Sequence, residues 1–218
     1  MTYDVVGNIA VLKFDKATKK EKKKLAEKLL KQNNIKTVLE KTEKVKGRFR
    51  KLKTRFLAGE KTTETLHKEN ACWFKLDVDE CYFSPRLSNE RKEVANKIKK
   101  NDKVLVMFSG VAPYPIVISK LSKAKKVVSV ELARSCNKYA KENVEINKVG
   151  NVEIIQGDVK KVVPKLKQKF EVIVMPPLNL KTCFLDSAFK VSKKGTRIFY
   201  YDFGRDVGDI LEKVYRES

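Results

Sequence analysis

Glycine and acidic residues stand directly after three apolar, strand-like segments in the second half of the chain. The segment "VLVMFS" is followed by Gly110, "KVVSVE" ends in Glu131, and "VEIIQG" is followed by Asp158. In parallel α/β sheets, ligands bind beyond the carboxyl ends of the strands. A glycine there lets a ligand approach the backbone, and a carboxylate about 20 residues later can accept hydrogen bonds from both ribose hydroxyls. Because Asp158 can accept from an adenine amino group, the set indicates an adenosine-containing ligand.

The loop around Gly110 distinguishes between two such ligands. Ala112 occupies the second glycine position, whereas NAD needs the complete GxGxxG loop for its phosphates. S-adenosylmethionine carries no phosphate, so the incomplete loop should weaken its binding little. We therefore expect S-adenosylmethionine as the cofactor, and its site to include the neighbouring residues Phe108, Leu132 and Val159. A plain strand-to-helix turn is the alternative interpretation of Gly110.

A fourth apolar segment, "FEVIVM", runs directly into two prolines. This arrangement resembles that of class I methyltransferases that modify a nucleobase, which often carry a proline-containing motif led by Asn or Asp. The leading side chain and the carbonyls that the prolines leave free grip the base. Here Met175 leads and Pro176 and Pro177 follow, so a thioether replaces the amide or carboxylate. We expect Met175 and Pro177 to contact the cofactor and Pro176 to contact the base.

The charge of the chain favours a polyanionic partner. Its 218 residues contain 49 Lys and Arg against 27 Asp and Glu, which gives a net charge of +22 and an isoelectric point near 9.8. Binding to nucleic acid strengthens with each phosphate that such cations neutralise. A Lys- and Glu-rich surface of the heat-adapted kind is the alternative, but it would not bring so large an excess of one sign.

Composition also argues against other classes of protein. Four scattered cysteines without a CxxC pair, together with a single His67, do not make a zinc site. No apolar run approaches the roughly 20 residues of a membrane span, and the first residues lack the layout of a signal peptide. We therefore expect no metal, no membrane contact and a cytoplasmic protein of a reducing compartment.

Two domains of different character must position these residues. Residues 1–84 are predicted to form a small basic α+β domain, with one helix that begins after Thr18 in a capping-box spacing to Glu21. Its strands are expected in "DVVGNIAVLKF", "KTVLEKT", "RFRKLKTRFLAG" and, as a pair, "CWFKLDVDECYFS".

Residues 85–218 follow a different pattern. Continuous Val- and Ile-rich segments alternate with helices, which is typical of a parallel sheet covered on both faces. The first helix is predicted in "SNERKEVANKIKK", with Ser88 as N-cap and an inner face of Val94, Ala95 and Ile98, and the last in "DVGDILEKVYRES". The predicted fold class is α/β, a Rossmann-like methyltransferase domain of class I preceded by the small basic domain.

Several segments carry a more specific resemblance. They include "YDVVGNIAVL", "VLEKTEKVKGRFR", "FLAGE", "FKLDVDECYFSPRLSNER", "MFSGVAPYPI" and "GTRIFYY". In this order, and over nearly the whole chain, they resemble the archaeal and eukaryotic tRNA (guanine-N1)-methyltransferases that act at tRNA position 37. That family includes archaeal enzymes of the wyosine pathway that methylate C7 of 4-demethylwyosine. The resemblance begins at the second domain, without the small N-terminal domain with which many members touch the tRNA elbow. It implies binding to the anticodon loop of a tRNA, expected to be tRNA-Phe, by a monomer.

The resemblance also assigns roles position by position. Glu90 matches the general base, which takes the N1 proton of guanine as the methyl group arrives; an ordinary acid in the first turn of a helix is the alternative. Arg50 matches a catalytic arginine on the O6 side of the base. Tyr82 is placed beside the methionine end of the cofactor, with a core aromatic as the alternative. The remaining candidates position the cofactor or the base: Lys53, Arg86 and Arg91.

Two positions depart from the family pattern. Val106 stands where the first strand usually carries an acid, which affects one cofactor contact. Met175 replaces the Asn of the N1-methylating motif, and a lost hydrogen bond to a buried base edge costs on the order of 1–3 kcal/mol. An apolar pocket suits a flat tricyclic base. We therefore expect methylation at position 37 on guanosine N1 or on C7 of the tricycle, with Met175 favouring the latter. A degenerate Rossmann RNA-binding protein and an rRNA methyltransferase are the alternatives.

Overall fold

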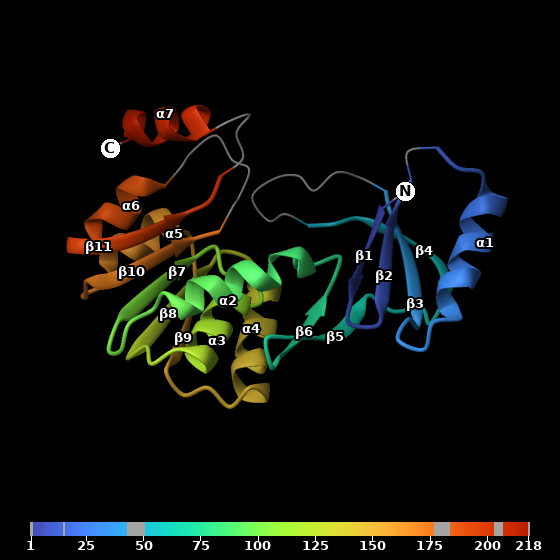
Figure 1. Ribbon diagram of the computed structural model, residues 1–218, viewed down its shortest axis with the longest axis horizontal. Helices are drawn as coiled ribbons and strands as arrows, with labels where there is room; N and C mark the ends of the chain where they lie inside the picture. The colour runs from blue at the N-terminus through green and yellow to red at the C-terminus, as the bar shows by residue number, and fades with distance from the viewer. Residues whose placement is uncertain (1, 15, 43–50, 177–183, 203–206, 218) are drawn as a thin grey trace. The chain divides into compact units, whose positions relative to one another are not determined.

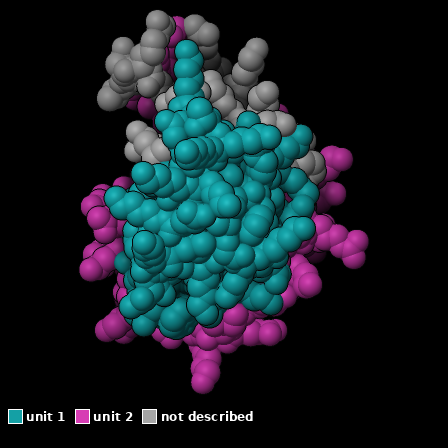
Figure 2. Space-filling model, turned by 90° about the vertical axis from the view of Figure 1, so that its right-hand side faces the viewer, with its two compact units in different colours: residues 1–88 teal, residues 89–218 magenta. Residues whose placement is uncertain are grey.

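The chain folds into two compact units, residues 1–88 and 89–218, which Figure 2 colours separately. The structure is a computed structural model that describes residues 2–14, 16–42, 51–176, 184–202 and 207–217. No helix within these ranges is long and apolar enough to cross a membrane.

Unit 1 is built on a four-stranded sheet with one helix packed against it (Figure 1). These elements, in chain order, are β1 (Thr2–Val6), β2 (Ile9–Lys13), α1 (Lys19–Leu30), β3 (Thr37–Lys41) and β4 (Thr54–Gly59). The strand order is β1-β2-β3-β4; β2 and β3 run parallel, and the other two pairs are antiparallel. Apolar side chains of the helix, the sheet and the loop between α1 and β3 form one core: Ala10, Leu12, Ala26, Leu29, Ile35 and Val38.

Helix α1 begins as the sequence predicts. The Glu21 amide donates to the Thr18 hydroxyl at 3.3 Å, and the Thr18 amide donates to the Glu21 carboxylate at 2.7 Å. These reciprocal bonds form the predicted capping box. They satisfy two backbone N–H groups that a helix start would otherwise leave without partners.

A buried carboxylate connects α1 with the sheet. Glu40 of β3 is 6% exposed and accepts from Lys22 of α1 and from Arg55 of β4, each at 2.6 Å. Burial alone would raise the pKa of Glu40, but the hydrogen bonds and charges of Lys22 and Arg55 outweigh it and lower the pKa. The three residues therefore act as an ionic clamp across three elements.

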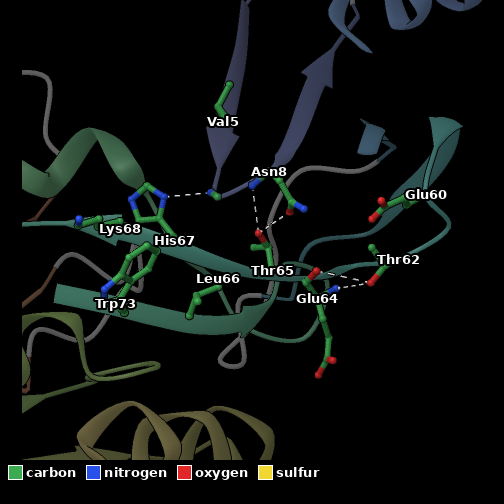
Figure 3. Close-up of a pocket in the computed structure, with 11 residues that line it drawn as sticks. Val5, Asn8, Glu60, Thr62, Glu64, Thr65, Leu66, His67, Lys68 and Trp73 are labelled. Carbon is green, nitrogen blue, oxygen red and sulfur yellow. Dashed lines mark hydrogen bonds between the residues drawn. The ribbon is translucent and has the colours of Figure 1, made fainter. Parts of the chain in front are cut away.

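A second, two-stranded sheet is formed by β5 (Glu64–Glu69) and β6 (Cys72–Asp77), which pair antiparallel. Two side chains of β5 fasten it to the turn between β1 and β2 (Figure 3). The Gly7 amide donates to His67 Nδ1 at 3.0 Å, and the Thr65 hydroxyl donates to Asn8 Oδ1 at 2.8 Å. A Cβ at Gly7 would lie 2.1 Å from Thr65 Oγ1, and its φ is 56°. Only glycine meets both conditions without strain.

The prediction of two strands in "CWFKLDVDECYFS" is wrong. Only β6 forms in these described residues, and its partner β5 precedes it in the chain. Asp77 ends β6, because its Oδ1 accepts from the amides of Asp79 at 2.8 Å and Glu80 at 3.1 Å. Short polar side chains commonly close turns in this way.

The prediction that Ser88 is an N-cap is also wrong. A 3-10 helix, Pro85–Leu87, runs directly into α2 (Ser88–Asn96), so Ser88 already has helical backbone angles. The predicted inner face is confirmed: Val94, Ala95 and Ile98 are buried.

Unit 2 contains a five-stranded sheet in which every neighbouring pair is parallel. Its elements after α2 are β7 (Lys103–Met107), α3 (Pro113–Leu121), β8 (Lys126–Glu131), α4 (Arg134–Ile146), β9 (Val152–Gln156), α5 (Val159–Val162), a 3-10 helix (Val163–Lys165), β10 (Phe170–Met175), α6 (Leu185–Lys190), β11 (Ser192–Tyr200) and α7 (Val207–Glu217). The strand order is β11-β10-β7-β8-β9, and the predicted Rossmann-like fold and C-terminal helix are confirmed.

This strand order creates one special place in the sheet. The chain starts at the central strand β7, proceeds outward to β9, and then returns to β10 on the other side of β7. Connections therefore leave β7 and β10 in opposite directions, and ligands of open α/β sheets bind at such a switch point. Strands β7, β8 and β10 are almost wholly buried, as their continuous apolar sequences require.

Candidate active site

The loop after β7 turns the chain sharply at the switch point. Phe108, Gly110 and Ala112 all have positive φ, of 54°, 56° and 66°. Left-handed backbone costs roughly 1–2 kcal/mol for a residue with a Cβ, so Phe108 and Ala112 hold strain that packing must offset. The ring of Phe108 meets that of Phe184 edge to face, with centroids 4.9 Å apart. Strained backbone of this kind gathers at binding sites.

Glu131, at the end of β8, braces that loop. Its Oε2 accepts from the Gly110 amide at 2.9 Å, and its Oε1 accepts from the Ala133 amide at 2.8 Å. Its carbonyl oxygen accepts from the Gly157 amide at 2.8 Å and from Asn137 Nδ2 at 2.9 Å. Glu131 therefore joins the chain ends after β7, β8 and β9. An ionised carboxylate has about four lone-pair sites, so acceptor capacity remains for the two predicted ribose hydroxyls.

Asp158 follows β9 and caps α5. Its Oδ1 accepts from the Lys160 amide at 3.0 Å, and the sequence analysis assigns its carboxylate to the adenine amino group. Val159 is buried in the core of unit 2, and Leu132 is half-buried after Glu131. The structure thus brings the predicted cofactor residues Phe108, Gly110, Glu131, Leu132, Asp158 and Val159 to one edge of the sheet.

Met175 ends β10 on the other side of the switch point. Its side chain is 2% exposed and belongs to the apolar core that includes Leu105, Ile173 and Phe184. Residue 175 therefore offers a nearby ligand no polar side-chain group, and its carbonyl accepts from the Tyr201 amide at 3.1 Å. Pro176, which follows, is half-buried.

Glu90 lies in the first turn of α2 and receives a hydrogen bond that the sequence analysis does not predict. The donor is the hydroxyl of Tyr201, one residue after β11. Burial, and then the hydrogen bond to Glu90, raise the pKa of Tyr201, so its hydroxyl keeps its proton and remains a donor. Since the Tyr201 amide also binds the Met175 carbonyl, one residue connects Glu90 with the end of β10.

Arg91 follows Glu90 and is almost fully buried, at 2% exposure. Its guanidinium carbon lies 5.8 Å from the centre of the Tyr114 ring in α3, within the range of a cation–π interaction. A buried arginine must be paired, so Arg91 is a fixed part of unit 2.

The other predicted site residues belong to unit 1. Tyr82 and Arg86 line a cavity of about 370 Å³ within that unit, where Arg86 Nε donates to Asp4 at 2.7 Å. Lys53 is exposed just before β4. Two predicted residues lie outside the described part of the chain: Arg50 and Pro177.

Sequence reasoning missed two residues that organise this edge. Tyr201 holds Glu90, and Asn137 of α4 holds the Glu131 carbonyl. The sequence "FYY" ends the last strand-like segment with tyrosines, and this polar end of a parallel strand could have indicated Tyr201 as a site residue. In the described ranges, no group of three His, Cys, Asp or Glu residues could hold a metal ion.

Known protein families match both units. The sequence pattern of the TRM5/TYW2 methyltransferase domain matches residues 65–217, and that of the TYW2 N-terminal domain matches residues 1–62. The chain is 35% identical over 204 residues to the tRNA (guanine(37)-N(1))-methyltransferase Trm5b of Pyrococcus abyssi, covering 93% of this chain and 60% of that protein. It is 32% identical over 215 residues to the tRNA(Phe) (4-demethylwyosine(37)-C(7)) aminocarboxypropyltransferase of Methanocaldococcus jannaschii, covering 99% of this chain and 81% of that protein.

The solved structure of the complex of aTrm5 and tRNALeu has the same architecture. It aligns with a TM-score of 0.87 at 32% identity, over 100% of this chain and 64% of that one. The chain thus spans about three fifths of the length of Trm5b and of this structure. Both sequence matches and the shared fold lead to one assignment: the chain belongs to the TRM5/TYW2 methyltransferase family.

Proposed function

We propose that this protein transfers a methyl group from S-adenosylmethionine to the base at position 37 of a tRNA. The observation that carries the proposal is the bond between Glu131 and the Gly110 amide at the switch point of the sheet. It places a carboxylate beside a loop that a ligand can approach closely. Family membership supports the reaction class.

The residues at this edge fit the cofactor. Glu131 would accept from the two ribose hydroxyls and Asp158 from the adenine amino group, while the backbone of the loop at Gly110 would lie beside the methionine chain. Apolar side chains around them exclude water: Phe108, Leu132 and Val159. At the methionine end we propose Tyr82, Arg86, Arg91, Met175 and Pro177. When bound, the cofactor supplies an electrophilic methyl group on its sulfonium sulfur.

Glu90 would be the general base for methylation at N1 of guanosine. The N1–H proton passes to its carboxylate while the N1 lone pair forms the new bond to carbon. Tyr201 orients that carboxylate by donating to one of its oxygens, which leaves the other free to accept the proton. On the RNA side we propose Arg50, Lys53, Arg86 and Pro176 as the groups that hold the base and its phosphates.

The substrate that we favour is the tricyclic precursor 4-demethylwyosine, methylated at C7 in tRNA-Phe. Met175 supports it, because a buried thioether gives the guanine edge neither donor nor acceptor. The N1 position of the tricycle is already substituted, so this substrate loses nothing by the absence of an amide. In this reaction C7 accepts the methyl group first, and the ring proton leaves afterwards.

One observation favours a second candidate, transfer of the aminocarboxypropyl group to the same C7. Residues 1–62 match the TYW2 N-terminal domain, and the aminocarboxypropyltransferase of M. jannaschii is covered over 81% of its length. Both reactions use one sulfonium cofactor but break different bonds. Methyl transfer leaves S-adenosylhomocysteine, whereas aminocarboxypropyl transfer leaves 5′-methylthioadenosine.

The test uses the intact protein and two tRNA-Phe substrates, one with guanosine and one with 4-demethylwyosine at position 37. S-adenosylmethionine labelled in its methyl group and, separately, in its carboxyl group is supplied to each. We expect methyl label in the tricyclic tRNA above that in the guanosine tRNA, with S-adenosylhomocysteine as coproduct. Carboxyl label in the RNA with 5′-methylthioadenosine as coproduct would establish aminocarboxypropyl transfer. If neither labelled form of S-adenosylmethionine labels the RNA, both candidate functions are overturned.

A further inference from the structure

Helix α1 carries an unusual concentration of positive charge. Residues 16–31 contain eight lysines against two glutamates, a net charge of +6. Residues 1–88 contain 22 Lys and Arg against 12 Asp and Glu, a net charge of +10. More than half of the excess charge of unit 1 therefore lies on one short segment, and its helix α1 packs against β3 and β4 of the four-stranded sheet (Figure 1).

Most of the described lysines of α1 and its C-cap have no ion pair. Within unit 1 the structure shows ion pairs for Lys22 and Arg55 with Glu40, Lys51 with Glu80, and Arg86 with Asp4. Lys23 reaches Glu27 only at 4.0 Å. Among the described residues of α1 and its C-cap, five exposed lysines have no ion pair: Lys19, Lys20, Lys24, Lys28 and Lys31. Their charge is left for solvent or for an external anion.

Helical spacing gathers three of the five on one line. Lys20, Lys24 and Lys31 are four and seven residues apart, so their side chains leave the same side of the helix. They are spaced along the axis by about 6 Å and about 10 Å at the rise of an α-helix. The opposite side contains Ala26 and Leu29, which are buried against the sheet. Lys20 and Lys24 of α1, together with Lys31 at its C-cap, are named here the outer face of α1.

This arrangement works against the stability of the helix itself. Lys20 and Lys24, and Lys24 and Lys28, are like charges at the (i, i+4) spacing, which repel each other. Lys19 and Lys20 also lie in the first turn, where the helix dipole disfavours cations. A surface that served only for solubility would mix acidic with basic residues. Local rules broken without a compensating contact are typical of functional sites.

We propose that the outer face of α1 binds the sugar-phosphate backbone of RNA. The inference rests on the proposed function in one respect, that the substrate is an RNA. Lysine ammonium groups act as point charges toward phosphates, and such contacts fix the position of an RNA without reading its sequence. The outer face supplies affinity and not base recognition, so its role is separate from that of Glu90 and Glu131.

The experiment compares two triple variants of the full chain. In the first, Lys20, Lys24 and Lys31 are changed to Gln, which keeps helix propensity. In the matched control, Lys99, Lys100 and Lys123 are changed to Gln; they are exposed near the amino ends of β7 and β8, away from the carboxyl edge. Binding of an unmodified tRNA-Phe transcript is measured between about 50 and about 300 mM salt, roughly a sixfold range.

For the first variant we expect the slope of log K against log salt to become shallower by about 2 to 3, which corresponds to three lost phosphate contacts. The control should keep the wild-type slope. Equal slopes for wild type and first variant, or equal losses in both variants, would overturn the proposal. Unfolding in urea distinguishes a loss of RNA binding from a folding defect. Removal of the like-charge repulsions should leave the free energy of unfolding of the first variant unchanged or raise it.

Group transfer from S-adenosylmethionine to tRNA-Phe, tested with guanosine and with 4-demethylwyosine at position 37, separates this inference from the proposed function. Wild-type protein that binds RNA through α1 but transfers no group would overturn the function and leave the inference standing. Wild-type protein that transfers the group, with an unchanged slope in the first variant, would overturn the inference alone. An α1 that serves an acidic protein partner would give that second result.

Discussion

At the scale of single residues, Glu131 has two tasks: it binds the backbone of the neighbouring loops, and it is proposed to bind the ribose of the cofactor. Both carboxylate oxygens already bind backbone amides, and the proposed ribose hydroxyls would add to these bonds. We expect Glu131→Ala to weaken cofactor binding by roughly 100-fold or more, since each hydrogen bond to a charged group contributes about 1.5–3 kcal/mol. Asp158→Ala should cost only about tenfold, because it removes a single adenine contact. Calorimetric titration checks this, and equal losses would contradict the assignment of Glu131.

Tyr201 is proposed to orient Glu90 rather than to react. Tyr201→Phe keeps the ring and removes the hydroxyl that holds the carboxylate. We expect kcat for methylation of guanosine N1 to fall by about 10- to 100-fold, the cost of a misplaced catalytic group, while cofactor affinity stays unchanged.

The neighbouring tyrosine provides the control for that prediction. Tyr200 donates to Asp202 at 2.9 Å and not to Glu90, so Tyr200→Phe should leave kcat near the wild-type value. If both variants lose kcat equally, or if Tyr201→Phe changes only cofactor binding, Tyr201 does not position the base.

Met175 tests the choice of substrate. In Met175→Asn, an amide can pair with the guanine edge, so we expect the ratio of kcat/KM for the two tRNAs to shift toward guanosine. Because Met175 is buried, an amide that turns into the core instead would lower stability by about 1–3 kcal/mol. Met175→Leu, which keeps size and apolar character, should preserve both the ratio and the stability. An unchanged ratio in a folded Met175→Asn protein would mean that Met175 is only a packing residue.

At the scale of secondary structure, local rules succeeded where the signal was local. The capping box of Thr18 and Glu21 and the strands of unit 2 follow from spacing and from continuous apolar sequence. The segment after Asp77 contains enough apolar residues to resemble a strand, but Asp77 itself closes a turn there. Strand β5 was missed because its sequence, "ETLHKE", places polar residues on both faces and so lacks the apolar–polar alternation that predicts a strand.

The site was predictable only in part, for a related reason. The carboxyl ends of parallel strands are a fixed place in this fold class, so Gly110, Glu131 and Asp158 could be found from sequence spacing. The bond between Tyr201 and Glu90 spans 111 positions in the chain, and no local pattern encodes it. That Glu131 binds the Gly110 amide directly was likewise visible only in three dimensions.

The ionic clamp of α1, β3 and β4 gives unit 1 a pH dependence with a definite sign. The pKa of Glu40 is lowered in the folded state by Lys22 and Arg55 despite its burial. Its contribution is therefore present above the unfolded pKa of about 4.3 and is lost as the pH falls through the lower folded value. Glu40→Gln should destabilise the protein by about 1.5–3 kcal/mol at pH 7.

The measurement is urea unfolding of wild type and Glu40→Gln at pH 7 and at pH 3. The two proteins should differ at pH 7, and the difference should shrink at pH 3. Glu27→Gln is the control, because Glu27 is exposed and only 4.0 Å from Lys23; it should change stability by less than about 0.5 kcal/mol. A Glu40→Gln difference that is the same at both pH values would contradict an ionised clamp.

At the scale of the whole molecule, positive charge is distributed over both units. Residues 1–88 carry a net +10, and residues 89–218 carry 27 Lys and Arg against 15 Asp and Glu, a net +12. The proposed cofactor site relies on different forces, because Glu131, Asp158 and their apolar neighbours meet a ligand without phosphates. One protein should thus bind its two ligands by physically distinct means.

Salt separates these two modes in the intact protein. If about five to eight phosphates are neutralised, log K for tRNA should fall with log salt at a slope of about −4 to −7. S-adenosylmethionine should give a slope near zero over the same range, because its contacts are short-range hydrogen bonds and apolar packing that salt screens little. Fluorescence anisotropy for the tRNA and calorimetry for the cofactor measure the two slopes on one preparation. A tRNA slope near zero would mean that the excess charge is only a solvated surface, and a steep cofactor slope would contradict the site at Glu131.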